Sequence, residues 1–189
     1  MKFVLVRHSK TKFDPNISIP LWYLTNEGKE KAQELFNNKD FPKVDLVYSS
    51  LQTKAVETAL ILAKSQTIPL KTDVNLTEVS SFTKEVFTNG YEEMVDSYYG
   101  GEVERLSGGE TITEAIERFE KTLDKISEIE KDNESIAIVT HGNILAFLTS
   151  KYDNTKTARE LHDFIQMPDY SVIDWDTKKF IKYWQGKQK

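Results

Sequence analysis

Short apolar runs alternate along the chain with longer stretches in which apolar residues recur at helical spacing. The runs over 2–6, 44–48 and 135–140 predict three buried strands, and a shorter strand is predicted to open at 68–70. Apolar residues three and four apart predict helices, which we place over residues 25–36, 55–63 and 111–129 and from about residue 144 onward. The segments 171–176 and 180–184 read as a closing β-hairpin.

This alternation is typical of an α/β fold. We predict a three-layer α/β/α arrangement, with a mostly parallel central sheet and helices on both faces. The length of 189 residues corresponds to one domain over residues 1–189. Residues 73–110 break the alternation with glycines and aromatic residues, and we interpret them as an excursion over the active-site edge of the sheet.

Composition narrows the range of functions. The chain has no cysteine, which excludes disulfides, thiolate metal sites and cysteine nucleophiles. Its formal charge is −5, with 25 basic residues scattered among 30 acidic ones, so we expect neither nucleic acid nor an anionic membrane as a partner. No stretch is apolar enough for a transmembrane span, and the first residues lack a signal-peptide pattern. These features predict a cytoplasmic protein.

Candidate chemistry gathers where the predicted parallel strands end. Arg7-His8-Ser9, Ser49-Ser50 and His141-Gly142-Asn143 each follow such a strand, and sites in open α/β sheets form beyond these ends. Two of the three histidines in the chain, and one of its four arginines, therefore fall on the same predicted edge. A single histidine there could equally be a hydrogen-bonded structural residue, but two at matching positions favour a functional site.

These residue types point to oxyanion chemistry. Arginine binds phosphate with its planar fork, and the helix start predicted near Gly142 offers backbone N–H groups to an anion. An imidazole can attack phosphorus and form a phosphohistidine, which divides one difficult step into two. The chain has no His-x-x-x-His pair and no Walker-type glycine loop, so we predict neither a metal nor another cofactor.

The residues at these strand ends resemble those of the histidine phosphatase superfamily, also called the phosphoglycerate mutase-like family. Val4 to Thr11 resembles its opening strand and Arg-His-Gly signature, and Val139-Thr140-His141-Gly142 resembles its last block. Six blocks occur in the family's order and span nearly the whole chain: residues 4–11, 24–32, 47–59, 76–78, 108–118 and 139–142.

The resemblance implies catalytic roles for His8, Glu78 and His141. By it, His8 is the nucleophile, and Glu78 protonates the leaving oxygen; a position beside Phe82 would suit Glu78 to this role. Arg7, Lys54 and His141 would hold the phosphoryl oxygens, together with the helix start at Gly142. Three departures from the family pattern stand out. Ser9 replaces a glycine and Lys10 after it a frequent acid. Lys54 replaces an arginine. Val79-Ser80 replaces a glycine and tryptophan after Glu78, which leaves Glu85 as the alternative acid.

The function predicted from these residues is metal-independent hydrolysis of small phosphate monoesters through a phosphohistidine. Two alternatives stay open. A phosphoglycerate mutase would need a lid that keeps water from the phosphohistidine, and residues 73–110 are short for that purpose. A phospho-ligand binding module with little turnover would fit the departures at Ser9 and Lys54. The partner in each case is a small phosphate compound, while its identity and the oligomeric state are not predicted.

Overall fold

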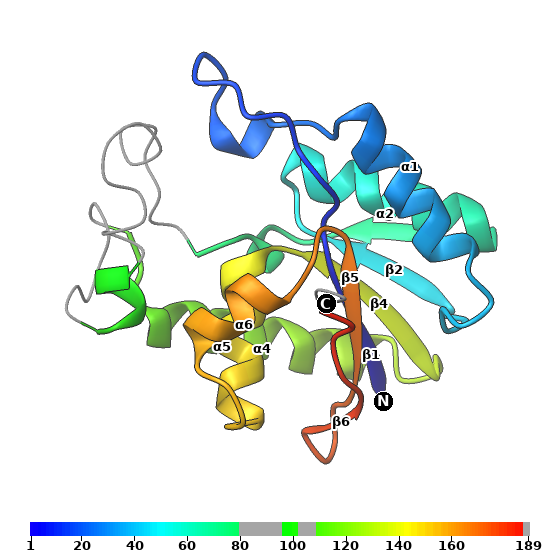
Figure 1. Cartoon of the computed structure of the whole chain (residues 1–189). Helices are drawn as coiled ribbons and strands as arrows, with labels where there is room; N and C mark the ends of the chain where they lie inside the picture. Colours follow the sequence, from blue (N-terminus) through cyan, green and yellow to red (C-terminus); the bar gives the residue numbers. More distant parts are fainter. Residues whose placement is uncertain (80–95, 102–108, 187–189) are drawn as a thin grey trace.

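A central six-stranded sheet organises the computed structural model, which describes residues 1–79, 96–101 and 109–186 (Figure 1). The strand order is β3-β2-β4-β1-β5-β6. Strands β1, β2, β3 and β4 pair in parallel, and β5 and β6 add two antiparallel strands at one side. The strands are β1 (Lys2–Arg7), β2 (Leu46–Ser49), β3 (Leu70–Thr72), β4 (Ser135–Thr140), β5 (Asp169–Asp174) and β6 (Lys179–Lys182).

Helices cover both faces of this sheet, which confirms the predicted three-layer α/β/α class. In Figure 1, α1 and α2 lie on one face, while α4, α5 and α6 lie on the other. The helices are α1 (Asn26–Asn37), α2 (Thr53–Gln66), α4 (Ile112–Ile129), α5 (Gly142–Tyr152) and α6 (Ala158–Phe164), with 3₁₀ turns η1 (Ile19–Leu21) and η2 (Val74–Leu76). None of the helices in the described residues combines the length and apolar character needed to cross a bilayer.

The uninterrupted apolar runs of the central strands follow from this layering. Along β1, Phe3 and Leu5 enter the core beneath α4 and α5, whereas Val4 and Val6 enter the core beneath α1 and α2. Successive side chains point to opposite faces of a strand, so a strand covered on both faces needs apolar residues at every position. The same division recurs in β4, where isoleucines face one layer and smaller residues the other.

Local capping signals set several helix starts. Thr25 accepts a hydrogen bond from the backbone of Gly28 and begins α1, and Thr111 and Glu114 form the predicted capping box of α4. Helix α5 begins at Gly142, directly after its N-cap residue His141 and two residues before the predicted start. At the other end, β6 stops at Lys182, and Trp184 packs in the core with its Nε1 donating to Thr149 Oγ1.

The predicted excursion over residues 73–110 is described in part. Its first residues form η2 and lead to Glu78, and residues 96–101 hold a helical turn in which Tyr98 is fully buried. The ring of Tyr99 stacks on Phe147 of α5, with centroids 4.8 Å apart. Phe82 and the alternative acid Glu85 lie outside the described residues.

Candidate active site

The parallel strands bring the two predicted site histidines together. Arg7 is in register with Thr140 across β1 and β4, so the residues that follow each strand emerge side by side. The backbone N–H of His8 donates to the carbonyl of Thr140 at 2.9 Å and fixes this alignment. The rings of His8 and His141 lie edge to face with centroids 5.3 Å apart.

One hydrogen bond sets the tautomer of the His8 ring. Its Nδ1 lies 2.8 Å from the carbonyl oxygen of Ser9. Because a carbonyl only accepts, Nδ1 carries the proton, and Nε2 keeps its lone pair. Burial lowers the pKa of His8 well below its ordinary value, and the charges of Lys54 and Arg7 act in the same direction. The imidazole is therefore neutral at neutral pH.

His141 is fully buried and is held by the end of the neighbouring strand. Its Nε2 lies 2.8 Å from the hydroxyl oxygen of Ser50, the residue that follows β2. Its Nδ1 makes no hydrogen bond to any residue that the structure describes. Burial lowers the pKa of His141 well below its ordinary value, and the nearby charges of Lys54 and Arg7 lower it further.

Arg7 depends on Gly142 for its position. Its Nη1 donates to the carbonyl oxygens of Ile165, at 2.6 Å, and His162, at 3.3 Å, both near the end of α6. A Cβ on Gly142 would lie only 2.7–2.8 Å from the guanidinium atoms of Arg7. Glycine at this position thus lets the guanidinium approach the first residue of α5.

Lys54 is buried in the first turn of α2, with 6% of its surface exposed. Its Nζ lies 5.5 Å from the ring centroid of Trp22. Burial lowers the pKa of Lys54 to about 8, while the charge of Glu78 raises it and that of Arg7 lowers it. The electrostatic coupling to Arg7, His8 and Glu78 places this lysine with the predicted site residues, although it stands where the family pattern has arginine.

Glu78 caps the start of α5. Its Oε2 accepts from the backbone and side-chain nitrogens of Asn143, at 3.0 and 3.1 Å, and its Oε1 accepts from the backbone of Ile144 at 2.8 Å. The N–H groups of Asn143 and Ile144 at the predicted helix start therefore already have an acceptor, the carboxyl group of Glu78. Glu78 is half-buried and hydrogen-bonded, and it is not a solvated surface residue.

Hydrogen bonds from three residues hold the turn that carries Glu78. Thr140 Oγ1 donates to the carbonyl of Leu76 at 2.7 Å, and Gln52 Nε2 donates to Thr77 Oγ1 at 2.8 Å. Arg118 donates to the carbonyls of Asn75 and Thr77 and pairs with Glu110. The arginine in the fifth family block thus holds the turn and does not enter the histidine pair.

Ser9, the first departure from the family pattern, points away from the histidines. It is fully buried, and its hydroxyl donates to the carbonyl of Gly28 at 2.6 Å. Its backbone N–H donates to Thr58 Oγ1 at 3.0 Å. Ser9 therefore ties the end of β1 to α1 and α2. Lys10, which follows it, forms an exposed ion pair with Glu27.

Three contacts in the site were not predicted from the sequence. Ser50 contacts His141, Trp22 lies against Lys54, and Asn143 contacts Glu78. The position of Asn143 beside the predicted helix start was a usable signal. The loop that carries Trp22 has no periodicity, so nothing in the pattern indicated its contact.

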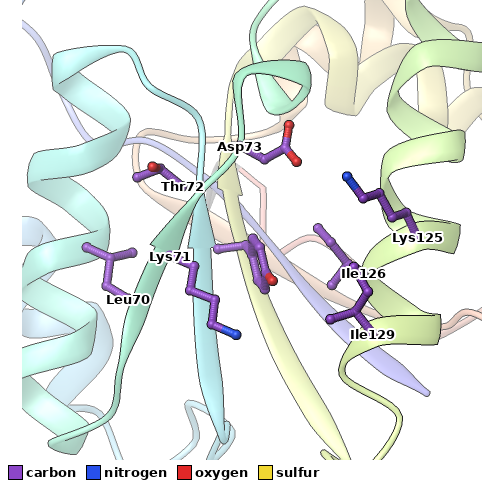
Figure 2. Close-up of a pocket in the computed structure, with 8 residues that line it drawn as sticks. Leu70, Lys71, Thr72, Asp73, Lys125, Ile126 and Ile129 are labelled. Carbon is purple, nitrogen blue, oxygen red and sulfur yellow. The ribbon is translucent and has the colours of Figure 1, made fainter.

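A separate groove of about 580 Å³ opens between β3 and α4 (Figure 2). Lys71 lies on its β3 side, Ile126 and Ile129 lie on its α4 side, and Asp73 lies where β3 ends (Figure 2). Lys71 is paired with Glu130, which also accepts from the hydroxyl of Tyr48. None of the predicted site residues lines this groove, so we do not assign the predicted chemistry to it.

Comparison with family models gives a match over nearly the whole chain. The model of the histidine phosphatase superfamily (branch 1) matches residues 3–185. The comparison with curated proteins found no match.

Similar solved structures cover the whole fold. Bacillus stearothermophilus YhfR has a TM-score of 0.75 and 21% identity, over 100% of this chain and 98% of its own. The alpha-ribazole phosphatase from Shigella flexneri has a TM-score of 0.72 and 22% identity, over 99% and 96%. A mycobacterial glucosyl-3-phosphoglycerate phosphatase in complex with VO3 has a TM-score of 0.68 and 15% identity, over 99% and 98%.

Proposed function

The chain belongs to the histidine phosphatase superfamily (branch 1), and from this premise we propose that residues 1–189 form one metal-independent phosphatase domain. It hydrolyses small phosphate monoesters through a phosphohistidine at His8. The names of similar proteins support this substrate class, since they include an alpha-ribazole phosphatase and a glucosyl-3-phosphoglycerate phosphatase. Structures of the latter include complexes with VO3 and with inorganic phosphate.

The observation that carries the proposal is the hydrogen bond from His8 Nδ1 to the carbonyl of Ser9. It fixes the tautomer, so that the lone pair on Nε2 is available for attack on phosphorus. The lowered pKa keeps the ring neutral at physiological pH, and a neutral imidazole is the reactive form. A purely structural histidine would not need both a fixed tautomer and two flanking cations.

The flanking groups provide the charge stabilisation. Negative charge in phosphoryl transfer is spread over the equatorial oxygens, and preorganised cationic donors stabilise it. In our proposal Arg7 and Lys54 supply positive charge, and His141 donates a hydrogen bond from Nδ1. Gly142 contributes by allowing the guanidinium of Arg7 to lie against α5.

The reaction then has two balanced steps. In the first, Nε2 of His8 forms a bond to phosphorus while the ester P–O bond breaks, and the leaving oxygen takes a proton from Glu78. In the second step, Glu78 takes a proton from a water molecule while the oxygen of that water attacks phosphorus, and the N–P bond breaks. Inorganic phosphate leaves, and both His8 and Glu78 return to their starting states.

A test of this proposal traps the intermediate. The protein is mixed with a ³²P-labelled monoester and quenched without acid, and the label is expected on His8 in an acid-labile, base-stable linkage. His8→Ala should carry no label. Label on Ser9, or turnover by His8→Ala, would overturn the assignment of the nucleophile.

The identity of the products separates the phosphatase from its alternatives. Free phosphate from a panel of phosphorylated metabolites supports hydrolysis. Isomerised phosphoglycerate without release of phosphate would instead identify a mutase, and tight phosphate or vanadate binding with no turnover on any ester would identify a binding module.

The role of Glu78 has its own test. Glu78→Gln should lower turnover of alkyl phosphates far more than that of nitrophenyl phosphate, because nitrophenolate leaves without a proton whereas an alkoxide does not. Equal losses on both substrates would exclude Glu78 as the acid and direct the same test to Glu85.

A further inference from the structure

A chain of hydrogen bonds runs from the excursion into the carboxylate of Glu78. The hydroxyl of Tyr99 donates to Asn143 Oδ1 at 2.5 Å, and Asn143 Nδ2 donates to Glu78 Oε2 at 3.1 Å. The ring of Tyr99 is fixed in turn, since it stacks on Phe147 one turn further along α5. Asn143 is 6% exposed, so its amide meets these partners largely away from water.

The amide of Asn143 is held between the hydroxyl of Tyr99 and the carboxyl of Glu78. An asparagine side chain has one accepting and one donating end, and the two can exchange places by rotation. With Tyr99 donating to Oδ1, the NH₂ end is turned toward Glu78. Without that hydroxyl, Oδ1 loses its partner, and the amide is free to rotate so that its NH₂ end no longer faces Glu78.

From these contacts we infer that Tyr99 and Asn143 are positioning residues that hold the carboxyl of Glu78 where it exchanges a proton with the leaving oxygen. The inference rests on the proposed acid role of Glu78. It assigns a function to a tyrosine from the 73–110 excursion, 44 residues away from Asn143 in the chain. Neither residue contacts the substrate in this account, so neither is a catalytic residue.

Tyr99→Phe is the cleanest test because it removes one hydroxyl and keeps the ring that stacks on Phe147. Loss of a single hydrogen bond of ordinary strength predicts a fall of about five- to tenfold in kcat on alkyl phosphates. On nitrophenyl phosphate, which needs no acid, kcat should change by less than about twofold. Asn143→Ala removes the direct bond to the carboxyl of Glu78, so the same pattern should be larger, about 10- to 100-fold on alkyl phosphates.

Tyr152→Phe is the matched control. This tyrosine lies on α5 as the last residue of the helix, and its hydroxyl donates to the carboxylate of Glu120. Its removal should leave the ratio of alkyl to aryl turnover unchanged. Thermal unfolding of each variant reports whether the fold is retained.

A double variant separates this inference from the proposed function. In a Glu78→Gln background, Tyr99→Phe should change the alkyl-to-aryl ratio no further, because the group that it positions is already gone. If Glu78→Gln alters the ratio but Tyr99→Phe lowers both substrates equally or not at all, the positioning role is wrong and the acid role stands. If Glu78→Gln leaves the ratio unchanged, both are wrong.

Discussion

Lys54 is a buried cation whose replacement should stabilise the fold while it abolishes phosphate binding. In Lys54→Met the apolar part of the side chain is retained beside Trp22, and the charge is removed. The pKa of Lys54 falls from 10.5 to about 8 on folding, chiefly through burial. Below pH 8 the lysine is protonated in both the folded and the unfolded chain, so the folded chain bears the full cost of the buried charge.

The magnitude follows from this pKa difference. At 1.36 kcal/mol for each pH unit, a buried ammonium costs about 3 kcal/mol at pH 7. Between pH 8 and 10.5 the folded chain gives up this proton before the unfolded chain does, so the cost decreases as pH rises and is about 1 kcal/mol at pH 10. Lys54→Met should therefore be more stable than the wild type by about 3 kcal/mol at pH 7 and by about 1 kcal/mol at pH 10.

Urea unfolding at the two pH values measures this effect. With an m-value of about 2–3 kcal/mol per M, the midpoint at pH 7 should rise by about 1 M. Lys64→Met, an exposed substitution on the same helix, controls for the general effect of methionine, and Lys54→Arg controls for removal of the charge. A Lys54→Met protein that is less stable at pH 7, or whose gain is equal at pH 7 and pH 10, would refute the reasoning.

Further expectations concern activity. The value of kcat/KM should fall above about pH 8 as free Lys54 loses its proton, and Lys54→Arg should remove that alkaline decline in a pH–rate profile. His8→Gln should show no turnover yet unfold at the wild-type urea concentration, since His8 follows a strand and is not part of either apolar core. Gly142→Ala should raise KM for phosphate esters by about tenfold or more, because its methyl group displaces the guanidinium of Arg7; an unchanged KM would exclude that dependence. Activity should survive dialysis against EDTA, and a loss restored by magnesium would contradict charge stabilisation by fixed side chains.

The sheet was predictable because its strands are buried on both faces. Each central strand, such as β1 or β4, is a continuous apolar run that ends in polar residues, and this pattern needs no knowledge of distant contacts. The strand ends then placed His8 and His141 on one edge, since parallel strands share their carboxyl side. Local capping signals such as Thr111 and Glu114 fixed helix starts for the same reason, because their partners lie within one turn.

The surroundings of the site were not predictable in the same way. The capping of α5 by Glu78 joins residues 65 positions apart, and the contact between Trp22 and Lys54 joins a loop without periodicity to a helix. Such contacts depend on where loops fold back over the sheet, and no local pattern records this. The helix start near Gly142 was expected to offer backbone N–H groups to an anion, and in the structure the N–H groups of Asn143 and Ile144 donate to Glu78 of the chain itself.

Two of the departures from the family pattern are linked in the structure. The backbone N–H of Ser9 donates to Thr58 Oγ1, and that hydroxyl donates to the carbonyl of Lys54 at 2.8 Å. The residue after His8, the proposed nucleophile, is thus connected through one side chain to the first turn of α2, where the lysine that replaces arginine lies. The same Ser9 supplies the carbonyl that orients His8, so this connection extends from the nucleophile to Lys54. Both contacts of residue 9 are made by its backbone, so a substitution there is expected to act on His8 and Lys54 only indirectly, by removing the hydroxyl that ties the end of β1 to the carbonyl of Gly28.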